Sequence, residues 1–502
     1  MALPDDPRAS NEAGQDARQG DPDLGSAALT ADDPQAARPQ RRLRGRAARY
    51  ADRDLTTGSV PRHLWSLSWP QMVGGIFGAL DQITDLFWAG LSGGFAAIGG
   101  LGAAQAYARI VTTGRNGLDL AMQAMLTRAI GAGRMDLVNR IVLQALMLNG
   151  VIASVLAVVG IFTSAWLLRV IGLSETVVEA AVVYLQLQFV GSVGQAFRQS
   201  TAHALMASGD VITPMKSTMA MRVIHLGSSP VLVFGLFGAP EMGIAGAAAA
   251  NIVAQVLGGA WNLRVLMTGS PRLVISLGGI KPDFPVLWQL LKIGAPAAAT
   301  QMERGISEVV VTWLVAPFGD AALAAHSLTR RVERLFFLGG FGLGRASGIL
   351  VGHNLGAGKP ERAKSTVKWA MVLMFAFRGG GALLLILFTG TFIGLFSGDR
   401  EFLVVAILWV QIHAAAGVFQ GTGQVLRQSF NIAGDTIAPL LITFVSLWTL
   451  EIPLALGLSR FTPLEQYGIP VAILIAMVVR MGLFGGYFAT GRWLRVQVLG
   501  QL

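Results

Sequence analysis

Cysteine is absent from the 502 residues of this chain, and charged side chains make up only 14% of them. Without a thiol, the chain can form no disulfide, no iron–sulfur cluster and no zinc site that uses cysteine ligands. The scarcity of charge, together with 53% hydrophobic residues and a mean hydropathy of +0.56, falls outside the usual range of soluble globular proteins. The composition therefore predicts a protein of the lipid bilayer.

Catalytic and nucleotide-binding motifs are also missing from the sequence. It contains no nucleophile elbow, no Walker loop, no HExxH pair and no paired metal-ligand motif. The glycine-rich stretch 339–344 lies inside an apolar segment and follows no strand, so it does not predict a phosphate-binding loop. We therefore expect no enzyme activity, no metal and no cofactor, and any uphill transport must draw on an ion gradient.

Long apolar segments, separated by glycine, proline and charge clusters, predict about twelve membrane-spanning helices. The expected spans of the first half are 64–90, 99–127, 138–169, 177–207, 212–237 and 244–267. Those of the second half are 290–316, 322–352, 364–396, 402–431, 437–458 and 468–490. Segments of this length favour helices over barrel strands, so the predicted fold class is an all-α integral membrane protein.

Three landmarks recur at a constant offset of 225 residues: Gly131-Ala132-Gly133-Arg134 returns as Gly356-Ala357-Gly358-Lys359, Gly209-Asp210 as Gly434-Asp435, and Gly243-Ile244 as Gly468-Ile469. A period of this length indicates a duplicated domain rather than a solenoid. An even number of spans per copy starts both copies on the same side of the membrane. The sequence therefore predicts two six-helix bundles in a parallel repeat, related by an axis along the membrane normal, with a seam between them.

The formal charge of +10 is concentrated partly in the basic stretch 40–46, just before the first apolar segment. In that place a basic stretch is typical of a topology signal and of a contact with anionic lipid. No aromatic residues are interleaved with it, so nucleic acid is not an expected partner. Lysine and arginine gather in the loops on the same side, which predicts that both termini are cytoplasmic and that the protein lies in the plasma membrane.

The predicted domain boundaries follow from these segments. Residues 1–57 form a basic tail without an apolar run, which we expect to be disordered and which does not resemble a signal peptide. The two lobes are expected at 58–270 and 290–502, joined by a linker at 271–289. We expect the protein to be a monomer.

Several motifs resemble the multidrug and toxic compound extrusion (MATE) family of secondary transporters. They are Trp69-Pro70, residues 83–90, Gly131-Ala132-Gly133, Gly209-Asp210 with Pro214, Gly243 to Ala248, Leu323-Ala324-Ala325-His326, and Gly434-Asp435. The resemblance covers residues 60–490 and implies twelve helices in two bundles with a large central cavity. It also implies export of organic molecules, coupled to the entry of protons or sodium ions.

Within this family, the damage-inducible branch is similar in its first-helix aspartate, which falls at Asp85. Asp81 precedes it by one helical turn, so both carboxylates lie on one face of the predicted helix. A low dielectric and a like charge both disfavour ionisation, so this pair can hold and release a proton. The alternative is that one of the two only pairs with a buried arginine.

The same branch often carries an asparagine and an aspartate in the fifth helix, where this chain has His225 and Ser229. Since imidazole titrates near neutral pH, His225 is a candidate proton carrier, although a lone helical histidine is also typical of packing. Glu303 and Glu308 lie near the functional glutamate of another branch, about 140° apart on the predicted helix. Arg304 precedes Glu308 by four residues, so an ion pair is the alternative interpretation.

The expected substrate is a bulky amphipathic molecule that contacts Phe77, Trp88 and Met302, although these residues also fit ordinary helix packing. Arg109 and Arg334 match at the repeat offset and are predicted to face the interior, because arginine is costly in lipid. Such arginines predict a cavity that accepts neutral or anionic molecules as well as cations. Arg115 and Asp119, spaced i and i+4, are expected to neutralise each other.

The sequence thus favours a secondary active exporter that works by alternating access, with protons ahead of sodium as the coupling ion. A flippase for lipid-linked precursors is the alternative of the same mechanical class, and it would also require cationic residues in its cavity. A membrane-embedded glycosyltransferase is less favoured, because the predicted outer loops are short.

Overall fold

The computed structural model describes residues 54–170, 174–268, 275, 281–394 and 400–499, all of which belong to one compact unit, Arg42–Leu502. Every regular element within these residues is a helix. Seven of the described helices are long and apolar enough to cross a membrane. The predicted all-α membrane fold is confirmed.

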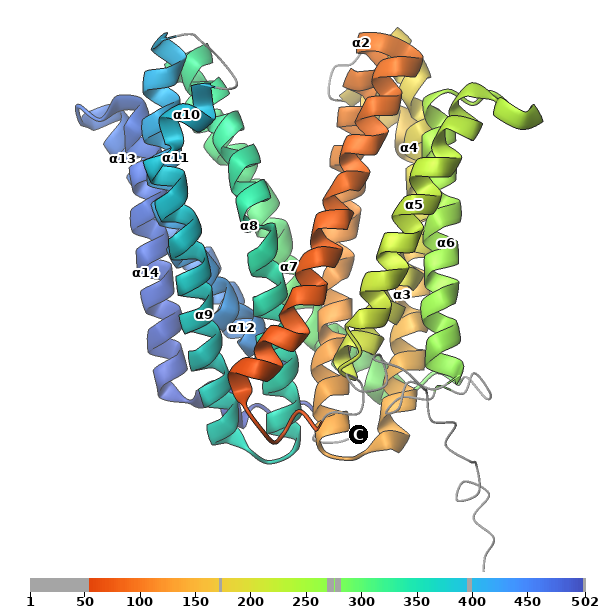
Figure 1. The fold of residues 1–502 in the computed structure, drawn as a ribbon, viewed down its shortest axis with the longest axis vertical. Coiled ribbons are helices and arrows are strands. Elements are labelled where there is room, and N and C mark those ends of the chain that lie inside the picture. The colour runs from red at the N-terminus through yellow and green to blue at the C-terminus, as the bar shows by residue number, and fades with distance from the viewer. Residues whose placement is uncertain (1–53, 171–173, 269–274, 276–280, 395–399, 500–502) are drawn as a thin grey trace, which may run out of the picture. The chain divides into compact units, whose positions relative to one another are not determined.

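The first half consists of α2 (Val60–Gly131), α3 (Met135–Val170), α4 (Glu175–Ala207), α5 (Ile212–Phe234) and α6 (Ile244–Thr268). A straight helix of the 72 residues of α2 would be about 108 Å long. However, Thr56, just before α2, accepts a hydrogen bond from Lys359, and Gly131 at the other end of α2 packs against His353. Both ends of α2 therefore lie beside the same short segment, residues 353–359. The ribbon of α2 accordingly rises and returns (Figure 1), which makes the two predicted spans 64–90 and 99–127.

The second half consists of α7 (Phe284–Val315), α8 (Asp320–Gly356), α9 (Pro360–Leu387), α10 (Thr389–Gly394), α11 (Arg400–Ala433), α12 (Ile437–Val445), α13 (Ile452–Phe461) and α14 (Gly468–Thr490). The predicted span 437–458 is not a regular helix, because the π-helical turn Ser446–Glu451 joins α12 to α13. Pro453 lacks the N–H that would continue the α-helical pattern, which explains the widened turn before it. The predicted span 364–396 is likewise divided between α9 and α10. Each half thus makes six passes.

Four long helices, α2, α5, α7 and α8, are not among the seven described helices that are long and apolar enough, with few enough charges, to cross a membrane. Each carries charged residues in its middle, such as Asp119, Arg222, Glu308 and Arg330. Charged side chains at membrane depth are tolerated in the protein interior or in a water-filled cavity. We therefore expect these four helices to border the interior spaces of the protein.

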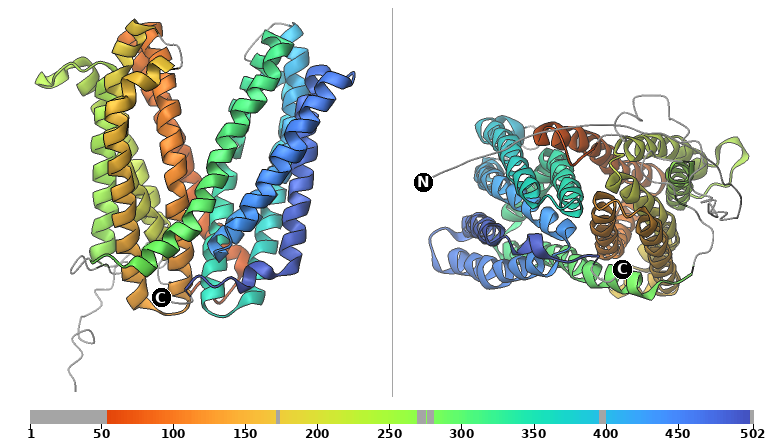
Figure 2. Two further views of the ribbon diagram at one scale, coloured as in Figure 1. Left: turned by 180° about the vertical axis from the view of Figure 1, so that it is seen from behind. Right: turned by 90° about the horizontal axis from the view of Figure 1, so that it is seen from below.

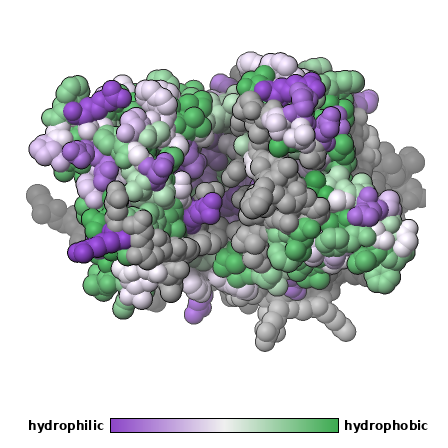
Figure 3. Space-filling view, turned by 90° about the horizontal axis from the view of Figure 1, so that it is seen from above, coloured by the Kyte–Doolittle hydropathy of each residue, from purple (hydrophilic) through white to green (hydrophobic). Residues whose placement is uncertain are grey.

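The first helix of each half begins against the opposite bundle. Leu64 and Leu67 of α2 share a buried cluster with Leu343 of α8 and Met374 of α9. The start of α7 is buried in the first-half cluster, where Val286 packs with residues of α2, α3 and α4. Figure 2 shows α7, in green, passing from the base of one bundle into the other. Seen from the end of the bundles that is opposite to this base, hydrophilic side chains gather in a hollow between the bundles (Figure 3).

Backbone contacts between α2 and α8 follow the repeat. A Cβ on Gly131 would collide with the carbonyl oxygen of His353, and a Cβ on Gly356 would collide with that of Arg128. These two contacts are equivalent at the offset of 225 residues, as expected for two copies related by a two-fold axis. Thr127 lies directly against Gly352, its own counterpart in the other copy, so the axis passes between them.

Hydrogen bonds reinforce this end of the bundles, which we call the crossing end. His353 Nε2 lies 2.8 Å from the carbonyl oxygen of Ala207, and Arg128 Nη2 donates to the carbonyl oxygen of Ala433 at 2.7 Å. His353 and Arg128 are again counterparts at the repeat offset, and each reaches the end of a helix in the opposite half. The helix ends of both halves are therefore tied to the same central pair of helices.

The recurring Gly-Asp motifs form turns between helices. Gly209 and Gly434 have φ values of 97° and 93°, a conformation that favours glycine. Asp210 accepts hydrogen bonds from the backbone N–H groups of Ile212 (3.1 Å) and Thr213 (3.0 Å) at the start of α5. Asp435 accepts from Ala438 N at 3.2 Å in the second copy. The aspartates therefore cap the following helices.

We expect Gly131→Ala and Gly356→Ala each to destabilise the protein by about 1–3 kcal/mol, because the added methyl group meets backbone rather than a movable side chain. Thermal unfolding of the purified protein, followed by tryptophan fluorescence, measures the effect. Gly380→Ala is the matched control, since nothing lies within 4 Å of a Cβ at that helical position. Equal melting temperatures for all three variants would contradict close packing at the crossing end.

We expect Asp210→Ala to destabilise the protein by about 1 kcal/mol, since it removes the acceptor at the start of α5. Asp210→Asn retains a side-chain oxygen for the same N–H groups and should keep most of the stability. The same unfolding measurement tests both variants. Substrate transport per folded molecule should be unchanged, and a specific transport defect in Asp210→Asn would mean that the carboxylate has a functional role.

Candidate functional site

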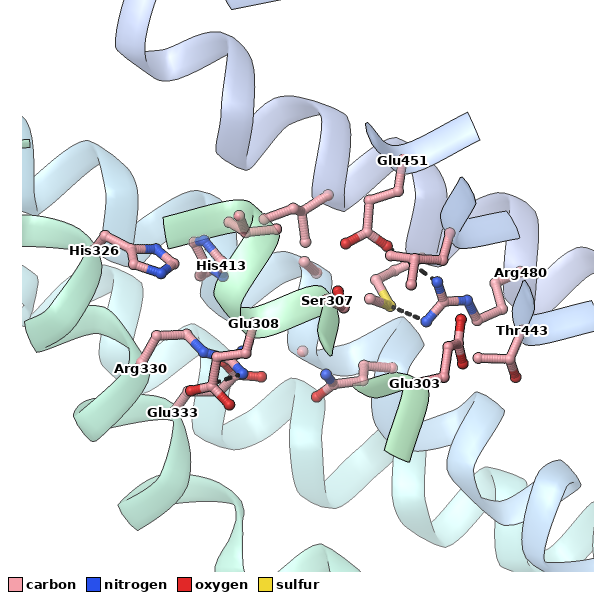
Figure 4. Close-up of a pocket in the computed structure, with 17 residues that line it drawn as sticks. Glu303, Ser307, Glu308, His326, Arg330, Glu333, His413, Thr443, Glu451 and Arg480 are labelled. Atoms are coloured by element: carbon pink, nitrogen blue, oxygen red, sulfur yellow. Dashed lines mark hydrogen bonds and ion pairs between the residues drawn. The ribbon is translucent and has the colours of Figure 1, made fainter. Parts of the chain in front are cut away.

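A cavity inside the second bundle brings together eight charged or histidine side chains of that half. It lies among α7, α8, α11, α12, α14 and the π-helical turn, and we call it the acidic cavity (Figure 4). Its charged and histidine residues are Glu303, Glu308, His326, Arg330, Glu333, His413, Glu451 and Arg480. Ser307, Gln420 and Thr443 add further polar groups, and Val311, Ile473 and Met477 are among its apolar ones.

Arg330 bridges two carboxylates at one side of this cavity. Its Nη1 lies 2.9 Å from Glu333 Oε2, one turn further along α8, and its Nη2 lies 3.5 Å from Glu308 Oε1 on α7. One guanidinium thus serves two carboxylates from different helices. This bridge links α7 to α8 through charge rather than through apolar packing (Figure 4).

Arg480 forms a second ion pair at the other side. Its Nη2 donates to Glu451 Oε2 at 3.0 Å, and its Nε donates to Ser446 Oγ at 2.7 Å. Ser446 and Glu451 are the first and last residues of the π-helical turn, so the irregular backbone presents both groups to one guanidinium. The carboxylate of Glu451 is almost fully buried, with 5% of its side chain exposed. π-helical turns occur frequently at functional sites in proteins.

The described charges that line the acidic cavity do not balance. Among the lining residues that the structure describes, four carboxylates, those of Glu303, Glu308, Glu333 and Glu451, outnumber the two arginines, Arg330 and Arg480. Glu303 is 6% exposed, and the rings of His326 and His413 flank Trp409 at centroid distances of 5.5 and 6.1 Å. A surplus of carboxylates at membrane depth is stable when it binds a proton or another cation. The cavity therefore has the chemistry of a cation-binding site.

Glu303 and Glu308, which we expected on different faces of one helix, line this same cavity. Glu308 points toward Arg330, and Glu303 lies near Thr443 on the other side of α7 (Figure 4). The two glutamates thus lie on different sides of α7, and the cavity reaches both sides of the helix. The side chain of Arg304 lies outside the described residues, and the partner found for Glu308 is Arg330.

His225 occupies a different environment in the first bundle. It is 1% exposed, and its backbone carbonyl oxygen accepts a hydrogen bond from Ser229 Oγ at 2.6 Å. It is not among the residues that line the acidic cavity. This position is compatible with the packing interpretation, and a role in proton transfer stays a prediction.

The predicted pair of Arg115 and Asp119 is confirmed. Arg115 Nη1 lies 3.6 Å from Asp119 Oδ2, and both side chains are almost completely buried. Asp119 Oδ1 accepts further hydrogen bonds from Ser200 Oγ at 2.5 Å and from Asn149 Nδ2 at 3.1 Å. This carboxylate is thus held by three helices of the first bundle.

The remaining predicted site residues are described to different extents. Asp81, Asp85 and Arg109 lie along α2 and Arg334 lies along α8, but their side chains are outside the described part of the chain. Phe77 is half-buried, and 45% of Met302 is exposed. The indole ring of Trp88 packs edge-on against Phe87 and Phe234, at centroid distances of 5.0 and 5.9 Å. Their contact with a substrate stays a prediction.

Sequence reasoning missed Arg330, His413 and Glu451. Glu451 offered a clear signal, because a carboxylate inside the apolar run 437–458 is costly unless it is paired or functional. Arg330 was obscured by its neighbours Arg331 and Arg334, since the sequence does not specify which of three nearby arginines reaches the carboxylates. His413 lies in an apolar helix without a nearby motif.

The family model MatE matches this chain twice, at residues 70–231 and 296–456. The two matches are displaced by the repeat offset of 225 residues to within one residue, and together they cover more than half of the chain. The duplication inferred from three landmarks is therefore a duplication of the whole family unit.

Curated relatives include the probable multidrug resistance protein YoeA of Bacillus subtilis, 26% identical over 379 residues, which cover 74% of this chain and 81% of the relative. The probable multidrug resistance protein NorM of Thermotoga maritima is also 26% identical, over 385 residues that cover 74% of this chain and 80% of the relative. The matched regions thus include most of both proteins.

Solved structures share the fold over nearly the whole chain. A MATE protein in the bent conformation superposes with a TM-score of 0.81 at 18% identity, covering 89% of this chain and 97% of that one. The Vibrio cholerae MATE transporter VcmN in its bent form superposes with a TM-score of 0.80 at 22% identity, covering 88% of this chain and 100% of that one.

The twelve-pass repeat, the interior charges and these matches agree with one another. The family model covers both halves, and the relatives that match most of the chain are transporters rather than enzymes. We conclude that this chain belongs to the MatE family of membrane transporters.

Proposed function

We propose that this protein exports amphipathic organic compounds from the cytoplasm in exchange for protons, or for sodium ions, by alternating access. The relatives named for multidrug resistance support efflux of organic compounds as the direction and class of transport. The observation that carries the coupling proposal is the surplus of carboxylates in the acidic cavity. The positive-inside pattern of the loops supports a plasma-membrane protein with both termini cytoplasmic.

Protonation of the acidic cavity changes its internal contacts. When every carboxylate is ionised, the described lining residues carry four negative charges and two positive ones, and the surplus negative charge attracts a cation. Binding of a proton to Glu303 or Glu308 removes part of that charge. In the case of Glu308, it also weakens the attraction across the 3.5 Å contact with Arg330, and so the link between α7 and α8.

The position of α7 connects this chemistry to the other bundle. The C-terminal half of α7 carries Glu303 and Glu308 in the acidic cavity, whereas its N-terminal half is buried against the first bundle. A change in how α7 packs in the second bundle therefore alters the contact between the bundles. An ion that binds one packing more tightly than the other shifts the equilibrium between inward-open and outward-open states.

The aspartates of the first half belong to the same proposal. Asp85, tuned by Asp81, is the coupling carboxylate that the resemblance to the damage-inducible branch implies, and His225 is a further candidate. Phe77, Trp88 and Met302 are proposed to contact the apolar part of the substrate, and Arg109 and Arg334 its polar part. Variants of Asp85 in the first half and of Glu303 in the second half distinguish ion coupling through both halves from ion coupling through one half.

We expect Glu303→Gln to lower proton-driven efflux from proteoliposomes by roughly 5–150-fold, the usual range of coupling between two sites. Exchange of labelled substrate across the membrane without a gradient should persist, because the substitution removes the ion site and not the substrate site. The measurement is efflux of a fluorescent substrate under separate proton and sodium gradients. Asp85→Asn is assayed in parallel to compare the two halves.

Glu361→Gln serves as the control, because that glutamate is exposed at the start of α9 and pairs only with Lys364 in the described contacts. Full gradient-driven transport by both Glu303→Gln and Asp85→Asn would rule out either carboxylate as the coupling group. Equal transport with and without any imposed gradient in the native protein would indicate a passive channel.

A further inference from the structure

A second cavity lies where the two bundles meet. It is bordered by α2, α4 and α5 of the first half and by α8 of the second half, and we call it the central cavity. Its polar lining residues are Gln71, Asn116, Arg198, Gln199, His203, Thr218, Arg222 and Arg345. It thus lies on the seam at which an alternating-access transporter binds its substrate.

Three arginines from three helices line the central cavity: Arg198 on α4, Arg222 on α5 and Arg345 on α8. No carboxylate occurs among its described lining residues, and the side chains of Asp81 and Asp85 lie outside the description. This composition is the reverse of that of the acidic cavity, where carboxylates outnumber arginines.

The carboxylate of Asp119 is close to this region but is already engaged. It is completely buried and is held by Arg115 at 3.6 Å and by Ser200 Oγ at 2.5 Å. His203, which does line the cavity, lies 3.8 Å from Asp119 Oδ2 through its Nδ1. Asp119 also interacts electrostatically with Arg345 and Arg198, so one described carboxylate is set against Arg115 and the three lining arginines in this part of the structure.

The position of Arg198 is fixed by its surroundings in α6. Its Nε donates to Gln255 Oε1 at 2.5 Å, and Gln255 Nε2 in turn donates to Asn251 Oδ1 at 3.2 Å. Gly258 makes room for the arginine, because a Cβ there would lie 3.1 Å from Arg198 Cδ. The side chain is thus held in a defined geometry before any ligand binds.

Apolar groups complete the central cavity. Met206, Met215 and Phe341 line it together with Pro70 and Val211. Gly74, Gly75 and Gly78 of α2 border it without side chains, which leaves room for a ligand on that side. A space with arginines and methionines on its walls suits a molecule with one charged group and an apolar body.

We propose that the central cavity binds the anionic group, a carboxylate or a phosphate ester, of an amphipathic substrate. This inference rests on the proposed export function and specifies its substrate class. Guanidinium groups at membrane depth are stabilised by an anion, and arginine binds carboxylate and phosphate through two parallel hydrogen bonds. The protein thus separates its ion chemistry: cations bind in the acidic cavity and anionic substrates between the bundles.

The test uses two dyes with the same xanthene core, anionic carboxyfluorescein and cationic rhodamine 123. Binding to the full-length purified protein is measured by fluorescence anisotropy, and transport is measured in proteoliposomes under a proton gradient. We expect the native protein to bind and transport carboxyfluorescein. Arg222→Gln and Arg345→Gln should each weaken its binding at least about tenfold, the loss expected for a charged hydrogen bond.

The control variants separate charge from folding. Arg222→Lys keeps the positive charge and should restore a large part of the binding. Arg169→Gln removes an exposed arginine, paired with Glu175 at 2.9 Å, which is not among the lining residues and should have no effect. The comparison of the anionic dye with the cationic dye can be made on the native protein alone. It therefore tests the proposal even if a substitution prevents folding.

A parallel assay identifies the source of the anionic group. Vesicles that contain a fluorescent prenyl phosphate, quenched from outside by dithionite, report translocation of a lipid-linked phosphate. Translocation that is lost in Arg222→Gln, without transport of carboxyfluorescein, would support the anion site and assign it to a lipid head group. Transport of rhodamine 123 alone, unaffected by either arginine variant, would overturn the anion site while leaving the exporter proposal intact. Failure to move either dye or the lipid would overturn both.

Discussion

The close approach of glycine to backbone across the repeat axis is the contact on which the architecture depends. In a membrane, apolar surfaces gain little by leaving lipid for protein, so helices associate through close packing and hydrogen bonds. Gly131 and Gly356 allow this packing at equivalent places, and Arg128 and His353 add a hydrogen bond on each side. The rest of the two bundles is thereby joined at one end, and a hollow remains toward the other (Figure 3).

The distribution of charge follows from the same arrangement. The charged helices α2, α5, α7 and α8 border the two cavities, together with α4, α11, α12 and α14. Acidic groups collect inside the second bundle, whereas arginines collect on the seam. Because α7 contacts both bundles, a change in one cavity has a direct structural route to the other.

Much of the fold could be predicted from the sequence, because the signals are periodic or repeated. The twelve passes, the duplication, the caps at Asp210 and Asp435 and the pair of Arg115 and Asp119 all depend on local spacing. The two cavities could not be predicted in the same way. Arg330 meets Glu308, and Arg480 meets Glu451, only through the way in which successive helices pack against each other, in the second case with the help of a π-helical turn.

The contact of Thr127 with Gly352 shows that the two halves are no longer interchangeable. These residues are counterparts, yet one carries a β-branched side chain and the other none, and the space that glycine leaves is filled by the threonine. Two first halves joined together would bring threonine against threonine, and two second halves would leave a gap between glycines. The two halves have thus become complementary at their centre, each shaped to pack against the other half rather than against a copy of itself.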